Sequence, residues 1–479
     1  MVTIPSLDSL PFTTSTPTPA DSTAWAQDLR ALVAQIGPRF ARSEARARVL
    51  AYLSGLLSPV KRKNGWQLAE QAGDCTPYAL QHLLDRAKWD ADAVRDDLQV
   101  YVRSQLADPE AILVIDETSF LKKGTHSVGV GPQYSGVTGH LENCQVGVFL
   151  VYATIQGATF YDRALYLPKD WAAAMERRRA ADVPAEVRFA TKPHLARRMV
   201  ERALDGGLPL RWVVGDEVYG NDGRLRQALE QRQQRYALTI SATTDLWIEW
   251  EQRTARDIIA AQPADAWARL SAGDGSKGPR VYDWTRVRVN NAYSPAWERW
   301  LVARRSVVTP DDPRSTAYFL VFAPADTALA EIVRALGRRW TIETGFEESK
   351  GEVGLTQYEV RSWQGWHRHI TLALLAHAFL VVLRARTHAQ DTPFLSAEVP
   401  MGSLQAFRQQ RGLCCPYPCR KRGACCGSCC VRHRRMMLRY GPGLGGGGIT
   451  RQSPNGVTTN AVWCGWPNWP QLLKYNCST

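Results

Sequence analysis

The sequence predicts an α/β protein with a mixed sheet, preceded by a helical domain. Apolar residues recur at helical spacing up to about residue 106, and three β-prone runs separated by glycine-bearing connections follow from Ala111 onward. Helices then alternate with short apolar strands. A chain of 479 residues, 45% hydrophobic and 22% charged, exceeds one domain and has a globular composition.

The expected elements occur in the order βββαβαβ. They are strands at residues 111–115, 145–154 and 158–167, a helix at 192–204, a strand at 211–214, a helix at 223–231 and a strand at 236–240. This is the order of an RNase H-like fold, in which the first and fourth strands lie side by side. We therefore expect the residues that follow these two strands to meet at one edge of the sheet.

Two aspartates occupy these positions. Asp116 closes the apolar run 111–115, and Asp216 closes the run 211–215. Neighbouring carboxylates repel each other unless cations lie between them. The pattern indicates a site for divalent cations and metal-dependent phosphoryl transfer, since carboxylate oxygens are ligands that Mg²⁺ prefers.

A third acidic residue, Glu343, lies in the segment 338–350, which we expect to be helical. On a helix, Arg339, Glu343 and Lys350 would share one face, so a carboxylate would stand between two cations. Such a face suits metal and phosphate. For an isolated glutamate, a solvated acidic helix is the usual alternative, and Glu347 shares much of the same face.

The formal charge of +13 and the pI near 9.3 favour a polyanionic partner such as nucleic acid, although a generally basic soluble enzyme has the same balance. Residues 24–106 form the expected helical, DNA-binding domain. Within it, residues 64–84 are typical of a helix-turn-helix motif, with Thr76 as the N-cap of the second helix. This second helix would present residues such as Gln81, His82 and Arg86 to DNA. A helical hairpin that only packs against its neighbours fits the pattern equally well.

The N-terminal residues 1–23 are rich in Ser, Thr and Pro and have no apolar h-region, which predicts a disordered leader and a cytoplasmic, nucleoid-associated protein. The apolar stretch 372–383 is too short for a membrane span and is expected to be a core helix.

A β-rich insertion is expected at about residues 242–325, between the second aspartate and Glu343. It contains Trp247, Trp250, Trp267, Trp284, Trp297 and Trp300. Exposed tryptophans could stack on extruded bases, and buried ones would fill a small core.

Several long motifs carry a family resemblance. They are Asp116-Glu-Thr-Ser119, Phe120-Leu-Lys-Lys-Gly124, Gly215-Asp-Glu-Val-Tyr-Gly220, Arg339-Trp-Thr-Ile-Glu343 with Lys350, and the basic, aromatic segment 354–369, of which 358–369 is expected to be helical. In these motifs the chain resembles the DDE transposases of bacterial insertion sequences. Among these transposases, it resembles the group that has a β insertion and a Tyr-Arg-Glu-Lys signature. Within that group, it most resembles the insertion-sequence seven-hundred-and-one branch.

The resemblance implies a catalytic domain at residues 107–386 whose catalytic and metal-binding acids are Asp116, Asp216 and Glu343. Two Mg²⁺ ions, for which Mn²⁺ can substitute, would serve the reaction. The expected DNA- or phosphate-binding residues are Arg339, Lys350, Lys122, Lys123, Arg361 and Trp300. The signature tyrosine does not carry over, because Leu336 stands seven residues before Glu343.

The resemblance also implies a function. The protein would bind the terminal inverted repeats of an insertion sequence, cleave double-stranded DNA at the element ends, join it to target DNA, and act as a homodimer in the DNA complex without a membrane partner. The main alternative is a catalytically impaired, transposase-derived DNA-binding protein. A weaker alternative is a metal nuclease acting on RNA or on DNA without sequence preference.

The tail at residues 387–479 departs from the rest of the chain. Nine of the 11 cysteines lie between Cys414 and Cys477, and Cys426 and Cys429 form a CxxC pair. The neighbouring cysteines do not match the spacing of an ordinary zinc finger or ribbon. We therefore favour a frameshifted or read-through end, with zinc binding as the alternative.

Overall fold

The computed structural model describes residues 19–275, 278–290 and 296–391. Most of the expected N-terminal leader and the cysteine-rich tail from residue 392 lie outside the described residues. Helix α1 (Pro19–Ile36) begins within the segment that we expected to belong to the leader.

The N-terminal part is helical, and helices α2 to α5 follow α1. Their bounds are α2 (Ser43–Leu56), α3 (Gly65–Ala72), α4 (Tyr78–Asp85) and α5 (Ala91–Leu106), with the short η2 (Gly37–Arg39) after α1. Asn64 caps α3 by accepting hydrogen bonds from two backbone N–H groups, and Gly73 ends that helix at a φ of 81°. The predicted cap of α4 is wrong, because Pro77 holds the N-cap position and no side-chain cap bond forms in this described helix.

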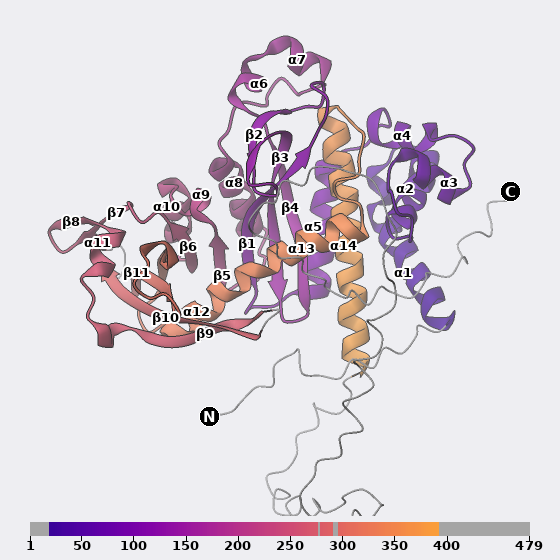
Figure 1. Cartoon of the computed structure of the whole chain (residues 1–479). Coiled ribbons are helices and arrows are strands. Elements are labelled where there is room, and N and C mark those ends of the chain that lie inside the picture. The colour runs from indigo at the N-terminus through magenta and orange to yellow at the C-terminus, as the bar shows by residue number, and fades with distance from the viewer. Residues whose placement is uncertain (1–18, 276–277, 291–295, 392–479) are drawn as a thin grey trace, which may run out of the picture. The chain divides into compact units, whose positions relative to one another are not determined.

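One 10-stranded mixed sheet organises the rest of the chain (Figure 1). Its strands are β1 (Ile112–Leu121), β2 (Gly131–Ser135), β3 (His140–Thr154), β4 (Gly157–Tyr166), β5 (Trp212–Gly215), β6 (Tyr236–Ile240), β9 (Ala268–Gly275), β10 (Gly278–Val289), β11 (Trp297–Ser306) and β12 (Ala317–Pro324). The order is β2-β3-β1-β5-β6-β12-β11-β10-β9, and β4 pairs with β3 off this path. The predicted fold class is confirmed, and β1 lies parallel to β5 as expected for the first and fourth strands of the βββαβαβ order.

The segment expected as a β-rich insertion continues the main sheet. Strand β12 pairs antiparallel with β6, and β11, β10 and β9 extend the sheet from there. A small hairpin, β7 (Asp245–Ile248) with β8 (Glu251–Thr254), and α11 (Ala255–Ala260) precede these strands. Sequence could not reveal this, because the pairing of β12 with β6 joins residues that are far apart along the chain.

Helices cover both faces of the sheet. Helices α13 (Thr341–Glu352) and α14 (Trp363–Asp391) lie on one face, and α8 (Lys192–Asp205), α9 (Glu217–Gly220) and α10 (Gly223–Gln231) belong to the other (Figure 1). The remaining helices are α6 (Lys169–Ala173), α7 (Met175–Ala180), η3 (Ala264–Ala266), η4 (Pro313–Ser315), α12 (Leu329–Gly337) and η5 (Arg338–Trp340).

Helix α14 begins at Trp363, so the first residues of the helix expected at 358–369 precede it. Among the described residues, α14 is the one helix long and apolar enough to cross a membrane, but 72% of its most apolar window is buried inside the protein. Its side chains from Leu372 to Ala376 are buried. This burial is typical of a core helix, as predicted for this stretch.

A buried ionic network joins the helical part to the sheet. Asp162 of β4 is fully buried and accepts hydrogen bonds from Arg202 of α8 at 2.8 Å and from Gln99 of α5 at 3.2 Å. The adjacent Arg163 donates to Asp92 of α5 at 2.7 Å and to Thr371 of α14 at 3.1 Å. These bonds link α5, β4, α8 and α14.

We expect Asp162→Ala to lower the free energy of unfolding by about 3 kcal/mol, because the substitution leaves buried cationic and amide groups without their acceptor. Urea unfolding of the full chain measures this change. Asp28→Ala is the matched control, since Asp28 is 42% exposed and pairs with an exposed arginine, so its loss costs less than about 1 kcal/mol. Equal losses for the two variants would contradict the structural importance of the network.

Candidate metal and phosphate site

Alternation along β1 directs successive side chains to opposite faces of the sheet. Thr118 accepts a hydrogen bond at 2.9 Å from Lys350 of α13, and Phe120 packs edge-on against Trp366 of α14. Asp116 lies on the same face, 3.8 Å from the guanidinium of Arg339. This face of β1 therefore meets the segment that contains the expected third acid.

Parallel pairing of β1 with β5 brings the two aspartates together. Ile115 pairs with Gly215, so Asp116 and Asp216 are the next residues on the two strands. Asp216 ends β5 and caps α9, where its side chain accepts a hydrogen bond from the backbone N–H of Val218 at 3.0 Å. The cap fixes the aspartate at the edge where β5 stops.

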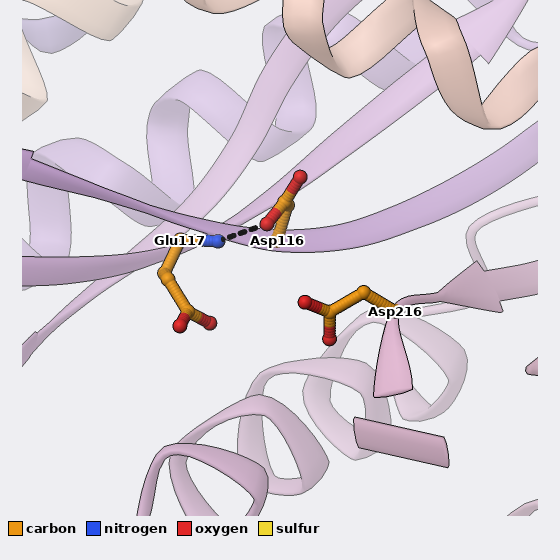
Figure 2. Close-up of side chains that lie close together, drawn as sticks. All are labelled: Asp116, Glu117 and Asp216. Carbon is orange, nitrogen blue, oxygen red and sulfur yellow. Dashed lines mark hydrogen bonds between the residues drawn. The ribbon is translucent and has the colours of Figure 1, made fainter. Parts of the chain in front are cut away.

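Three carboxylates meet at this edge of the sheet. One oxygen each from Asp116, Glu117 and Asp216 lies within 4.8 Å of the others, and Figure 2 shows the Asp216 carboxylate facing the other two residues. Among the described residues, this is the group of three acidic, histidine or cysteine side chains that could hold a metal ion.

Burial and nearby negative charges raise the affinity of both aspartates for protons. Burial, followed by the charge of Asp216, raises the pKa of Asp116 to about 7, although the nearby Arg339 opposes the shift. Burial, followed by the charge of Glu117, raises the pKa of Asp216 to about 6. Without a bound cation, part of the site is therefore protonated near neutral pH.

The donor set fits a hard divalent cation. All three groups are carboxylates, which Mg²⁺ and Mn²⁺ prefer, and the set contains no thiolate or imidazole that would select zinc. Burial and the neighbouring carboxylates raise both aspartate pKa values, and a divalent cation would offset the cost of the negative charges.

Glu117 is the member of the cluster that sequence reasoning missed. Its carboxylate accepts a hydrogen bond from Lys192 of α8 at 2.7 Å and another from the hydroxyl of the buried Tyr219. Strand alternation predicts that Glu117 points away from Asp116, yet one oxygen of each lies within 4.8 Å of the other and of Asp216. The sequence signal that could have identified Glu117 is its position directly after Asp116 in the motif Asp116-Glu-Thr-Ser119.

The structure does not bring Glu343 into that three-acid cluster. Glu343 lies on α13, is 40% exposed, and accepts a hydrogen bond from Arg339 at 3.0 Å. The same guanidinium is 3.8 Å from Asp116, so one positive charge stands between the predicted third acid and the first. The shared helical face predicted for Arg339 and Glu343 is present.

The other expected phosphate-binding residues have different surroundings. Burial lowers the pKa of the Lys350 ammonium, which donates to Thr118, and lowers that of Lys122 to about 8 where its ammonium lies 3.6 Å from the centre of the Tyr358 ring. Lys123 and Arg361 are exposed.

Trp300 requires a correction. Its side chain is 3% exposed, and the guanidinium of Arg286 lies 5.0 Å from the ring centre, so the ring packs in the sheet and is not available to stack on a base. Trp284 is also fully buried. Trp247 and Trp250, on the β7–β8 hairpin, are 52% and 93% exposed.

Comparison with known proteins identifies relatives of the chain. Residues 35–288 match the family model described as "DDE superfamily endonuclease". The matched segment contains Asp116 and Asp216 and ends before Glu343. The chain is also similar to the probable transposase for insertion sequence element IS701 of Microchaete diplosiphon, with 24% identity over 329 residues that cover 64% of this chain and 74% of that protein. The resemblance predicted from the motifs is confirmed.

The raised pKa of Asp116 predicts a pH-dependent stability in the absence of divalent cations. The unfolded chain releases this proton near pH 4 and the folded chain near pH 7, so this carboxyl group costs folding stability progressively as the pH rises from about 4 to about 7. We expect Asp116→Asn to remove this cost and to raise the free energy of unfolding at pH 8 by about 2 kcal/mol.

Urea unfolding in EDTA across this pH range measures the difference. It should shrink toward pH 4, and the exposed Glu217→Gln should show no comparable gain. An Asp116→Asn protein that is less stable than the parent at pH 8 would contradict the claim that the ionised Asp116 carboxylate destabilises the fold.

Proposed function

The chain belongs to the DDE superfamily endonucleases, and from this premise we propose that it is a transposase of an insertion sequence. It would bind the terminal inverted repeats of its element, cleave double-stranded DNA at the element ends and transfer the freed ends to target DNA. As a metal-dependent nuclease of this family, it would act on DNA in the cytoplasm, as a dimer that pairs two element ends.

The observation that carries this proposal is the meeting of Asp116 and Asp216 at the edge where β5 ends. Two partly buried aspartates with raised pKa values are costly unless a cation or a reaction uses them. Both lie in the segment that matches the endonuclease family.

Asp116, Asp216 and Glu117 would hold the first divalent cation, and Glu343 would contribute to a second position on the other side of Asp116. When bound, two Mg²⁺ ions, for which Mn²⁺ can substitute, would activate the attacking oxygen and stabilise the leaving oxygen of a phosphodiester. The carboxylates would position these ions, and Tyr219 and Lys192 hold Glu117 in place through its two oxygens.

Arg339 and Lys350 would neutralise and orient the DNA phosphates. The Arg339 guanidinium is within 4 Å of both Asp116 and Glu343. It has the planar donor geometry that pairs with phosphate. Lys350 approaches the same face of β1 through Thr118. Leu336, at the place of the signature tyrosine, packs against the core, so a phosphate contact there would fall to the neighbouring Arg338.

We expect Asp116→Asn and Asp216→Asn each to reduce Mg²⁺-dependent nicking at the element boundary by at least about 1000-fold, because each substitution removes a carboxylate of the cation site. Binding to element-end DNA should persist, since the acids repel phosphates. Single-turnover cleavage of labelled element-end duplex and a gel-shift assay measure the two properties.

Glu217→Gln is the control, since it neutralises an exposed acid in the same motif and should keep cleavage within about threefold. A parent protein that binds the repeats without nicking them under Mg²⁺ or Mn²⁺ would favour the alternative, a catalytically impaired DNA-binding protein. Cleavage without regard to the repeats would favour a general nuclease.

Arg339→Gln should have opposite effects on metal binding and on cleavage. Loss of a positive charge close to Asp116 and Glu343 should tighten Mn²⁺ binding to the DNA-free protein about three- to tenfold, whereas loss of the phosphate contact should slow cleavage about 100-fold. Titration of Mn²⁺ followed by electron paramagnetic resonance measures the first effect.

Arg338→Gln removes the same charge from the neighbouring position and is the control for general electrostatics. Weaker or unchanged Mn²⁺ binding by the Arg339→Gln protein would contradict the proposed competition between this guanidinium and the cations.

A further inference from the structure

We propose that a cavity beside the acid cluster binds the phosphate backbone of duplex DNA as it leaves the cleavage site. The proposal rests on the proposed function, because it takes DNA as the substrate. The cavity lies between the start of α5, the end of β4, helix α8 and the start of α14.

Positive side chains outnumber negative ones among the residues that line this cavity. Its volume is about 720 Å³, and six arginines line it against three acidic residues, Asp90, Asp92 and Glu186. The arginines are Arg95, Arg163, Arg188, Arg198, Arg202 and Arg368. The excess of positive charge in a recess of this size favours an anionic ligand.

The inner cations are held by protein groups, which leaves the outer ones for a ligand. Arg163 pairs with Asp92 at 2.7 Å, and Arg368 donates to four backbone carbonyl groups. Arg188 and Arg198 are exposed at the rim. The buried arginines therefore shape the wall, and the exposed ones can meet a phosphate.

Helix α8 presents a stripe of cationic and polar side chains to the cavity. His194, Arg198 and Arg202 occur at positions i, i+4 and i+8, which share one helical face, and all three line the cavity. Arg197 is the adjacent residue but lies outside the cavity lining and pairs with Glu201 at 3.3 Å on the same helix.

Three helices start at this cavity, which adds the partial positive charge of their N-termini. Ala91 and Asp92 belong to the first turn of α5, Trp363 and Gln364 to that of α14, and His194 to that of α8, which Thr191 caps. Helix N-termini favour phosphate groups through their free N–H donors and the helix dipole. The carboxylate of Asp92 offsets part of this field but is itself neutralised by Arg163.

The same helix connects the cavity to the acid cluster. Lys192, the first residue of α8, donates to Glu117 of the cluster at 2.7 Å, and His194, two residues further along the helix, lines the cavity. The exposed Arg198 follows Lys192 by about 9 Å along the helix axis at 1.5 Å per residue, or about three base-pair steps of 3.4 Å. A DNA strand with one phosphate at the acid cluster could therefore place its following phosphates along α8. A small free anion would contact only one of these positions, so the arrangement favours DNA as the ligand.

The test compares Arg198→Ala with Arg197→Ala in the full-length protein. Both variants remove one arginine from adjacent positions of α8, but only Arg198 lines the cavity. The probe is a fluorescein-labelled duplex of arbitrary sequence, because backbone contacts do not depend on base sequence. Fluorescence anisotropy at several salt concentrations gives the affinity and its salt dependence.

We expect Arg198→Ala to weaken duplex binding about three- to tenfold at low salt and to reduce the slope of log K against log salt by about 0.9, the loss of one phosphate contact. Arg198→Lys should restore the slope, since an ammonium also neutralises a phosphate. Arg197→Ala should stay within about twofold of the parent protein, with an unchanged slope.

Equal effects of the two alanine variants would overturn the proposal, because general charge alone would then explain binding. So would a failure of the parent protein to bind duplex DNA. Failure of the proposed function is distinguishable: a protein that binds duplex through Arg198 but never nicks it would keep this surface and lose the enzyme assignment. Unfolding curves check that the variants fold, as expected for the exposed Arg198 and the half-buried Arg197.

Discussion

The parallel pairing of β1 with β5 is the constraint on which the candidate site depends. Its register, with Ile115 opposite Gly215, sets Asp116 and Asp216 side by side at the point where β5 ends. Sheet hydrogen bonds and buried apolar side chains hold this register, since every β5 residue is buried. The fold thus places two carboxylates close together in a largely buried setting, and burial with the neighbouring negative charges raises the pKa of both.

The surrounding cations divide according to the two faces of the sheet. On one face, Arg339 and Lys350 reach β1 from η5 and α13. On the other, Lys192 of α8 reaches Glu117, and the rest of α8 runs along the cationic cavity. The buried bonds of Asp162 and Arg163 fix α5, α8 and α14 around that cavity. The same buried hydrogen bonds therefore hold the helices together and position the arginines of the cavity.

Sequence predicted the features that depend on local pattern. The apolar runs before Asp116 and Asp216 predicted the two strands, although β1 continues through Asp116 to Leu121, and the βββαβαβ order predicted that they are adjacent. The spacing of Arg339 and Glu343 predicted their shared helical face. Long-range pairings outside the βββαβαβ order were not predictable. The joining of β12 to β6 and the burial of Trp300 depend on partners distant in the chain, as does the meeting of Glu117 with Asp216. The role of Glu343 in catalysis stays a prediction.

The central claim is that the carboxylates at this edge of the sheet form a site for divalent cations. Anomalous diffraction from crystals of the full chain grown with Mn²⁺ tests it most directly, because manganese can be located independently of any assumed mechanism. The account predicts a manganese peak within coordination distance of Asp116 and Asp216, about 2.0–2.2 Å for such oxygen ligands. Crystals with manganese bound only elsewhere, or with the two aspartates free of metal at saturating Mn²⁺, would contradict it.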